Sequence, residues 1–121
     1  MVKNIDYSFK RGDTYNLKKF KVLDKEGKDI ILTPTEQLYF TMKTSTKTAE
    51  YVLQKRIGNG IELQEDGYYH ITMEPKDTKG LNYGEYFYDI ELKSTNPKEL
   101  VKTLIEGTIF LEDEVTWGGN E

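Results

Sequence analysis

The side chains that most often carry catalysis or bind metals are scarce in this sequence. The chain contains one histidine, His70, and no cysteine. A zinc site or a Cys–His catalytic pair would need a second histidine or a cysteine, and this chain offers neither. His70 alternates with apolar neighbours in the segment 68–74, on the polar side of a predicted strand. We therefore interpret His70 as an ordinary surface residue.

Carboxylates are abundant, so a pair of acids acting on one substrate stays open as a chemical hypothesis. The densest cluster is Glu112, Asp113 and Glu114. Adjacent side chains on an extended strand point to opposite faces, so this triplet is poorly arranged to converge on one substrate. We interpret it as a solvated strand end that also discourages edge pairing.

A second group of acids surrounds Gly27. Asp24, Glu26 and Asp29 vaguely resemble the alternating oxygen ligands of a calcium loop, but the twelfth-position glutamate and the flanking helices are missing. A hairpin loop in which Gly27 takes a positive φ is the simpler prediction. The sequence also has no phosphate-binding loop, nucleophile elbow or Ser–His–Asp set. We predict a non-enzymatic protein without catalytic residues, bound metal or cofactor.

Aromatic residues are the remaining candidates, because Tyr and Trp dominate the energetics of protein interfaces. The chain has nine Tyr, five Phe and one Trp. The Tyr excess is typical of β-sheet packing, and it also suits a platform that binds carbohydrate or protein. Trp117, in a glycine-containing segment, either folds back onto the domain or contacts a neighbour. The candidate interface residues are Tyr39, Tyr51, Tyr68, Phe87 and Trp117.

The tripeptide of Arg11, Gly12 and Asp13 is the motif that many adhesive proteins present to integrins. It lies between two predicted strands, where Gly12 supplies an unusual backbone angle and Asp13 bonds its own main chain. We therefore interpret it as a turn, with Arg11 incidental.

Charge argues against several partners. The net charge is −4, and 31% of the residues are charged with both signs mixed. Nucleic-acid binding needs a concentrated basic face, so no such partner is expected. The densest basic segment, residues 18–21 (KKFK), is interpreted as the wet face of a strand, and a polyanion site there is the weaker alternative. No apolar run approaches the ~18 residues of a membrane span, so no membrane partner is expected.

Period-two alternation of apolar and polar residues recurs along the chain, as in Leu38, Phe40 and Met42, and predicts strands with one wet side. Turn residues separate the strands at intervals of about eight to twelve residues, as in sandwiches and barrels. Residues 75–80 instead predict one helical turn that begins at Pro75. We predict one all-β domain over residues 1–121, with a flexible tail from about 112 to 121. The predicted strands are 4–10, 14–23, 29–32, 36–44, 50–57, 61–64, 68–74, 85–93 and 99–111.

The last predicted strand is long, and Gly107 interrupts it. A glycine inside a strand suggests a bulge or a bend, across which the inward-facing positions change parity. The expected core residues of this strand are Val101, Ile105, Ile109 and Leu111.

Three segments of the chain carry turn and strand motifs that occur together in one family of proteins. Residues 9–44 contain a Gly-Asp-Thr-aromatic strand start, an Asp/Gly turn and an Ile-x-Leu-Thr step. Residues 66–94 contain a proline turn followed by Gly-x-Tyr-x-Tyr-Asp-Ile-x-Leu, and residues 100–117 contain a Gly-Thr strand, a polar step and Val-Thr. One departure is the sequence Pro34-Thr35 after Leu32-Thr33, where the family often has a Thr-Gly turn.

The resemblance is to the N-terminal domain of baseplate upper proteins and to related immunoglobulin-like tail and neck components. It implies an antiparallel immunoglobulin-like β-sandwich of about eight strands. It also implies a phage or prophage structural protein of the tail, baseplate or head–tail assembly, which is made in the bacterial cytoplasm and located in the virion. Its implied partners are other virion proteins and further copies of itself. The alternatives are a glycan- or ligand-binding β-module that uses exposed tyrosines, and a small phage-encoded inhibitor of a host protein.

Overall fold

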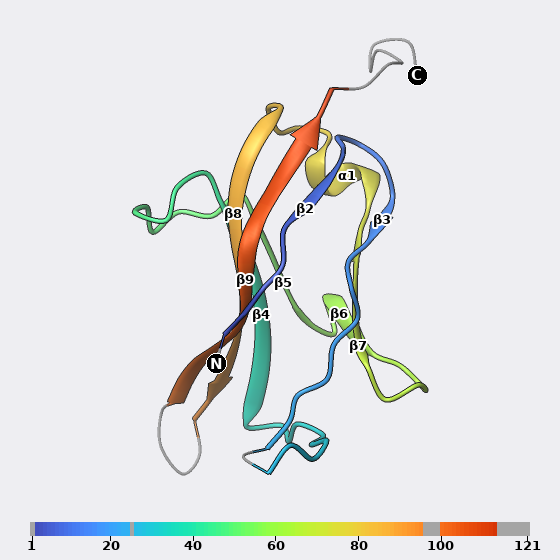
Figure 1. Cartoon of the computed structure of the whole chain (residues 1–121), viewed down its shortest axis with the longest axis vertical. Helices are drawn as coiled ribbons and strands as arrows, with labels where there is room; N and C mark the ends of the chain where they lie inside the picture. Colours follow the sequence, from blue (N-terminus) through green and yellow to red (C-terminus); the bar gives the residue numbers. More distant parts are fainter. Residues whose placement is uncertain (1, 25, 96–99, 114–121) are drawn as a thin grey trace.

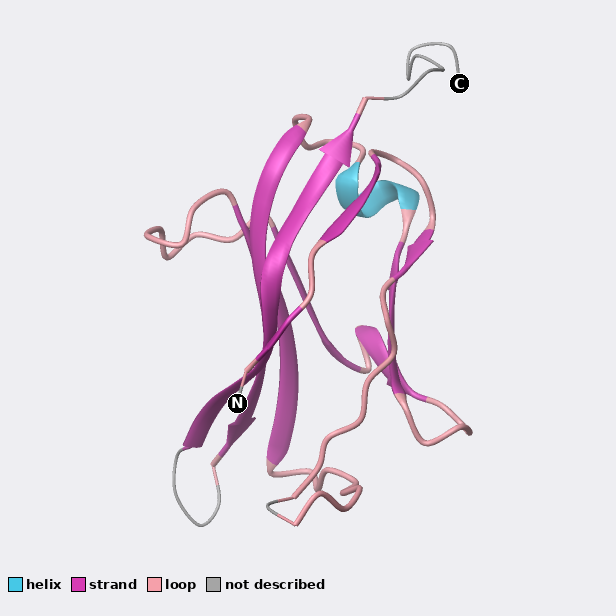
Figure 2. Ribbon diagram, viewed as in Figure 1, coloured by secondary structure: helices cyan, strands magenta, loops and turns pink. Residues whose placement is uncertain are grey.

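One mixed sheet curls into a half-barrel in the computed structural model (Figures 1 and 2). The structure describes residues 2–24, 26–95 and 100–113. The strand order is β1-β9-β8-β4-β5-β6-β7-β3, and β2 pairs with the second half of β9. The elements are β1 (Lys3–Asn4), β2 (Tyr7–Lys10), β3 (Tyr15–Asn16), β4 (Glu36–Lys43), β5 (Leu53–Ile57), β6 (Gly60–Leu63), β7 (Tyr69–Met73), α1 (Pro75–Thr78), β8 (Gly84–Ser94) and β9 (Leu100–Glu112).

The sheet has two facing parts. The long strands β4, β8 and β9 form one part, and the shorter β6, β7 and β3 lie opposite (Figure 1). The sheet changes direction between β5 and β6, where Gly58 and Gly60 have φ angles of 89° and 102°. Glycine is needed there because other residues rarely adopt such angles. This tight turn lets the second part fold back over the first.

The core lies between these two parts, and the alternation seen in the sequence identifies it. Leu38, Phe40 and Met42 on β4 have no exposed surface. The alternate residues of β7 and β8 are also buried: Tyr69, Ile71, Met73, Tyr86, Tyr88, Ile90 and Leu92. The predicted all-β class is therefore confirmed, because every strand except the exposed β1 contributes apolar side chains to a common core.

Two features of the sheet differ from the expectation. The sheet is not wholly antiparallel, since β1 and β2 both run parallel to β9, and β5 pairs briefly in parallel with β6. The predicted strand 14–23 is reduced to β3, and residues 29–32 form no strand. Beyond β3 the amide of Lys18 donates to the hydroxyl of Tyr7 at 3.0 Å, so it does not join a strand ladder. Leu17 and Phe20 still bond to β7, but the bridge at Phe20 is isolated, so no continuous ladder extends β3.

The irregularity in β9 lies at Leu104 and not at Gly107. Ile90 of β8 pairs with Ile105, while the next residue of β8 pairs with Thr103, so Leu104 is the extra residue of a bulge. Consequently Val101 is 52% exposed, against the expectation, while Ile105, Ile109 and Leu111 are buried as expected. Gly107 has a different role: because it has no Cβ, the backbone carbonyl of Ile5, between β1 and β2, can approach it closely.

The helical turn predicted at residues 75–80 is confirmed as α1. Its capping box joins Glu74 and Asp77, and Pro75 occupies the first turn, where a missing N–H costs least. Asp77 also binds the ammonium of Lys55 at 2.8 Å, with both side chains nearly buried. Within the described residues, no helix has the length and apolar character needed to cross a bilayer.

The turn at residues 11–13 packs against the region around α1. Gly12 has a φ of 85°, as expected, and its amide donates to the hydroxyl of Thr78 at 2.8 Å. Arg11 donates to the carbonyl of Leu81 at 3.1 Å, and its guanidinium lies 4.5 Å from the ring centroid of Tyr83. The expectation that Arg11 is incidental is therefore wrong. The triplet is a structural turn whose arginine is bound within the fold.

Candidate functional site: a pocket on the outer face of the sheet

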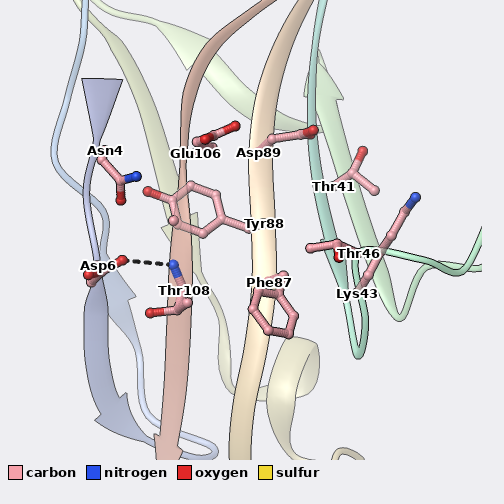
Figure 3. Close-up of a pocket in the computed structure, with 11 residues that line it drawn as sticks. Asn4, Asp6, Thr41, Lys43, Thr46, Phe87, Tyr88, Asp89, Glu106 and Thr108 are labelled. Carbon is pink, nitrogen blue, oxygen red and sulfur yellow. Dashed lines mark hydrogen bonds between the residues drawn. The ribbon is translucent and has the colours of Figure 1, made fainter. Parts of the chain in front are cut away.

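A pocket of about 470 Å³ lies along β4, β8 and β9 (Figure 3). Because alternate residues of these strands fill the core, the intervening residues face outward. The residues that line the pocket come from these three strands, the segment around β1 and the loop after β4. They are Asn4, Asp6, Thr41, Lys43, Thr46, Phe87, Tyr88, Asp89, Glu106, Gly107 and Thr108. Phe87 supplies an outward aromatic ring, and most of the other side chains are polar or charged.

The N-terminal segment closes one side of this pocket. The carboxylate of Asp6 accepts the amide N–H of Thr108 at 2.9 Å, in the place where a paired strand would supply a carbonyl. The hydroxyl of Tyr88 donates to the carbonyl of Ile5 at 2.6 Å. Burial raises the pKa of the Tyr88 phenol, so it remains a donor at neutral pH. These two bonds fix the segment between β1 and β2 against the sheet.

Among the carboxyl groups that line the pocket, that of Asp89 has a clearly shifted pKa. Burial raises the pKa of Asp89 from 3.8 to about 6, and the charges of Glu91 and Glu106 add to the increase. Lys43 and Lys93 partly offset it. Asp89 and Glu106 are direct cross-strand partners, and like charges in that arrangement are destabilising. A carboxylate retained where it costs stability is a candidate for a functional group.

Replacing Asp89 with asparagine should stabilise the protein at pH 7 and not at pH 4. The folded-state pKa is raised, so the folded form binds the proton more tightly, and stability falls as pH rises from 3.8 to about 6. After a discount for partial exposure, we expect Asp89→Asn to add about 1 kcal/mol at pH 7. Urea unfolding at both pH values measures this change. Glu85→Gln, on the exposed start of β8, is the control, and an equal gain at both pH values would contradict the argument.

The sequence-predicted interface residues do not form one surface. Phe87 lines the pocket, and Tyr39 lies on the same outer face of β4, with the Lys93 ammonium 5.0 Å from its ring centroid. Tyr51 is 54% exposed in the connection before β5. Tyr68 precedes β7 in the opposite part of the sheet. Trp117 lies outside the described residues.

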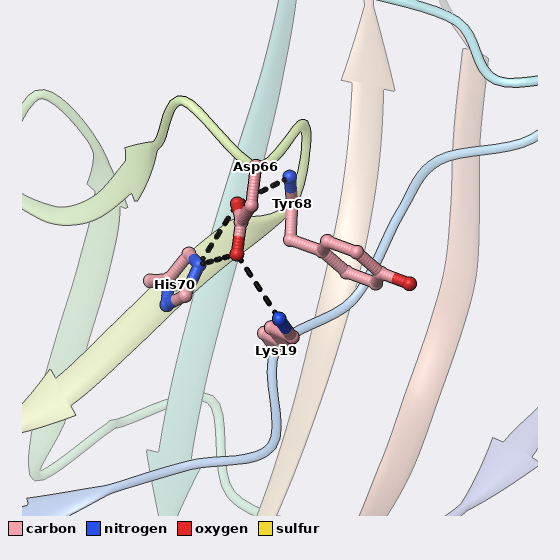
Figure 4. A network of polar contacts seen from close by, with 4 residues as sticks. All are labelled: Lys19, Asp66, Tyr68 and His70. Carbon is pink, nitrogen blue, oxygen red and sulfur yellow. Dashed lines mark hydrogen bonds and ion pairs between the residues drawn. The ribbon is translucent and has the colours of Figure 1, made fainter.

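Tyr68 belongs to a separate polar network (Figure 4). The ammonium groups of Lys19 and Lys21 lie 4.4 and 4.7 Å from the centroid of its ring. Asp66 accepts bonds from the amide of Tyr68, from Lys19 at 3.1 Å and from the His70 ring. The amide bond from Tyr68, then Lys19 and His70, lower the pKa of Asp66 to about 2.

His70 is therefore partly exposed, as expected, but has a specific partner. Its Nε2 lies 3.0 Å from a carboxylate oxygen of Asp66, four residues earlier. Lysines 19 and 21 also have defined contacts, so the segment KKFK is not simply a solvated face. The contacts order this corner of the molecule.

The acidic residues of the outer pocket were not identified from the sequence. Asp89 was recognised only as a polar residue alternating with core positions. Its convergence with Glu106 depends on the pairing of β8 with β9, whose bulge shifts the register by one residue. The sequence showed Asp89 and Glu106 only as charged residues within predicted strands. Such residues are too common to identify a functional site.

The suspected calcium loop is a hairpin turn. One carboxylate oxygen of Asp24 accepts the amides of Glu26 and Lys28, both at 2.9 Å, and Gly27 has a φ of 83°. In the described part of the chain, no three His, Asp or Glu side chains are grouped so as to hold a metal ion.

Comparison with protein-family models gave no matching family, and comparison with curated proteins gave no similar relative.

Proposed function

We propose that this chain is a non-enzymatic structural protein of a phage or prophage particle. It acts by packing against neighbouring proteins in the tail, baseplate or head–tail assembly. The three segments that resemble virion proteins support this proposal, as does an all-β sheet with a pocket on its outer face. In this proposal the half-barrel is a variant of the immunoglobulin-like β-sandwich, with β6, β7 and β3 as its second sheet.

The observation that carries the proposal is the acidic outer pocket with its single phenylalanine ring. Asp89 and Glu106 repel one another in the isolated chain, and burial adds to the cost at Asp89. A basic side chain from a neighbouring protein would relieve both effects, because it would pair with the carboxylates. An arginine suits the site best, since its planar guanidinium can also stack on Phe87. The pocket is thus complementary to a basic anchor residue.

The proposed location in the virion is tested by purifying phage particles from a host that carries the gene. We expect mass spectrometry of washed particles to detect this chain at a stoichiometry comparable to other tail or neck components. Particles that form normally without the chain, and never contain it, would contradict the virion assignment. The position of the gene among tail or capsid genes is an independent check.

The pocket is tested by replacing Phe87 with serine. We expect this variant to bind its neighbour in the particle at least about tenfold more weakly, which is the usual loss for an interface hot spot. The matched control is Phe110→Ser, because Phe110 is 48% exposed on β9 and does not line the pocket. Binding of both purified variants to that neighbour is measured by calorimetry. Equal loss in the two variants, or no loss in Phe87→Ser, would rule out the pocket as the contact.

A glycan- or ligand-binding module is the second candidate, and the same pocket favours it. Its volume of about 470 Å³ is in the range of small-ligand sites, and an aromatic ring beside polar groups suits a sugar. Glycan-array binding that is lost in Phe87→Ser and retained in Tyr51→Ser would establish this function. Such a site would use Phe87 in place of the exposed tyrosines.

A further inference from the structure

A second cavity, of about 750 Å³, lies where the half-barrel fails to close. One wall is formed by β1 and the start of β9, and the other by the segment after β3. Buried Phe20, Val22 and Ile105 contribute an apolar floor. The rim contains five lysines, which we call the lysine groove: Lys3, Lys18, Lys19, Lys21 and Lys102. Among the described lining residues, the acidic ones are Asp24 and Asp29, although the whole chain carries a net charge of −4.

Three of the groove lysines are available to a ligand. Lys19 pairs with Asp66 at 3.1 Å, and Lys21 pairs with Asp29 at 2.8 Å. Lys3, Lys18 and Lys102 form no ion pair with any described residue. The groove therefore has uncompensated positive charge above an apolar floor, and it fits a segment that alternates acidic and apolar side chains.

An unpaired strand edge adjoins the groove, whose lining on β9 begins at Lys102. β1 begins to pair with β9 only at Ile105, so among the described strands residues 100–103 of β9 pair with β8 alone. Leu100 and Val101 in this stretch are about half exposed, at 50% and 52%. Such an edge is a template for an added strand, whose main-chain bonds supply affinity while side chains supply specificity.

The chain itself carries a complementary sequence at the other end of β9. Asp113 and Glu114 are acidic, and they are followed by Val115 and Trp117. In an extended conformation Asp113, Val115 and Trp117 would lie on one face and Glu114 on the other. Val115 and Trp117 would match the groove floor, and Glu114 on the opposite face would match the lysines of the rim.

The same molecule cannot supply this segment to its own groove. Figure 1 shows β9 running from one end of the molecule to the other. Thr103 and Glu112 are separated by about 30 Å at the usual strand rise. The chain from Glu112 to Trp117 reaches at most ~18 Å when fully extended. Trp117 can therefore enter a lysine groove only in another molecule.

We propose that residues 113–117 of one copy dock in the lysine groove of a second copy. The segment adds a strand to the edge of β9, with Trp117 on the apolar floor and Glu114 beside the free lysines. The contact joins unlike surfaces, so it builds rings or open filaments and not closed two-fold dimers. This inference extends the proposed assembly role to contacts between copies. It does not use the outer pocket, so either one can fail without the other.

The test uses the fluorescence of Trp117, which is the only tryptophan in the chain. As concentration rises toward the millimolar range, the emission should shift to shorter wavelength and iodide quenching should fall. The mass measured by light scattering should rise over the same range, and added salt should reverse both changes. Emission independent of concentration, or a monomer throughout, would overturn the proposal.

Reversing the charges of the lysine groove and of residues 113–114 tests whether these two surfaces contact each other. The groove variant Lys3→Glu/Lys18→Glu/Lys102→Glu and the segment variant Asp113→Lys/Glu114→Lys should each associate at least about tenfold more weakly than the native chain. An equal mixture of the two should recover association, because the basic segment fits the acidic groove. The control variant reverses exposed cations outside the groove, at Lys47, Arg56 and Lys76.

Circular dichroism verifies that each variant is folded, and Trp117→Ala provides a second route if the groove variant is not. Trp117→Ala should weaken association without changing thermal stability. Equal weakening in the control variant, or a mixture that stays monomeric, would overturn the assignment of these two surfaces.

Discussion

Gly107→Ala is expected to detach the N-terminal strands from the sheet. A Cβ built on Gly107 would lie 2.0 Å from the carbonyl oxygen of Ile5 and 2.9 Å from a carboxylate oxygen of Asp6. The first clash is with backbone, so no side-chain rotation relieves it. Overpacking of this kind costs about 3 kcal/mol, and the melting temperature should fall by roughly 10 °C. Thermal unfolding followed by circular dichroism measures the change.

The matched control is Gly80→Ala, because a Cβ there meets no atom within 4 Å and Gly80 lacks a positive φ. It should leave stability within about 0.5 kcal/mol of the native value. Hydrogen exchange locates the damage. The amides of β1 and β2 should lose protection in Gly107→Ala, while those of β4 keep theirs. A uniform loss across the sheet, or a melting temperature unchanged from the native chain, would refute this role of Gly107.

Lys55→Met should destabilise the fold by breaking its buried ion pair. The ammonium of Lys55 lies 2.8 Å from the Asp77 carboxylate, and the two side chains are only 7% and 8% exposed. Removing one partner leaves the other charge buried, which typically costs 3–5 kcal/mol. Asp77 keeps the amide bond from Glu74, at 2.8 Å, so we expect about 3 kcal/mol. Urea unfolding at pH 7 gives the value.

Arg56→Met is the control on the same strand, since Arg56 is exposed on the opposite face of β5. It should change stability by less than about 0.5 kcal/mol. The double variant Lys55→Met/Asp77→Asn should recover part of the loss, because no unpaired charge then remains buried. If the double variant is as unstable as the sum of the single ones, lost packing and not lost pairing explains the effect.

The two surfaces proposed here carry opposite charge. The outer pocket concentrates Asp89 and Glu106 on one face, and the lysine groove concentrates cations at the open seam. Their contributions almost cancel in the net charge, so the bulk value gives no sign of either. This explains why the composition argued only against nucleic acid and gave no indication of either charged surface.

Alternation in the sequence was sufficient to find most of the core. It placed Leu38, Phe40 and Met42 inward because only one face of each strand can be apolar when the other meets solvent. It failed at residues 29–32, where Ile31 is 76% exposed and pairing with residues 22–23 is limited to an isolated bridge at Asp29. The alternation of apolar and polar residues predicts which side chains share a face of a strand. It does not predict whether a partner strand lies beside that segment.

The all-β class, the helical turn at Pro75 and the glycine turns follow from local preferences of the backbone, so the amino-acid sequence was enough to predict them. The parallel N-terminal strands, the bulge at Leu104 and the two charged surfaces became visible only in the folded chain. Asp89 pairs with Glu106 across β8 and β9, and Lys3 and Lys102 line one cavity because β1 pairs with β9 at Ile105. Such pairings are set by register and by the closure of the sheet, which no local pattern encodes.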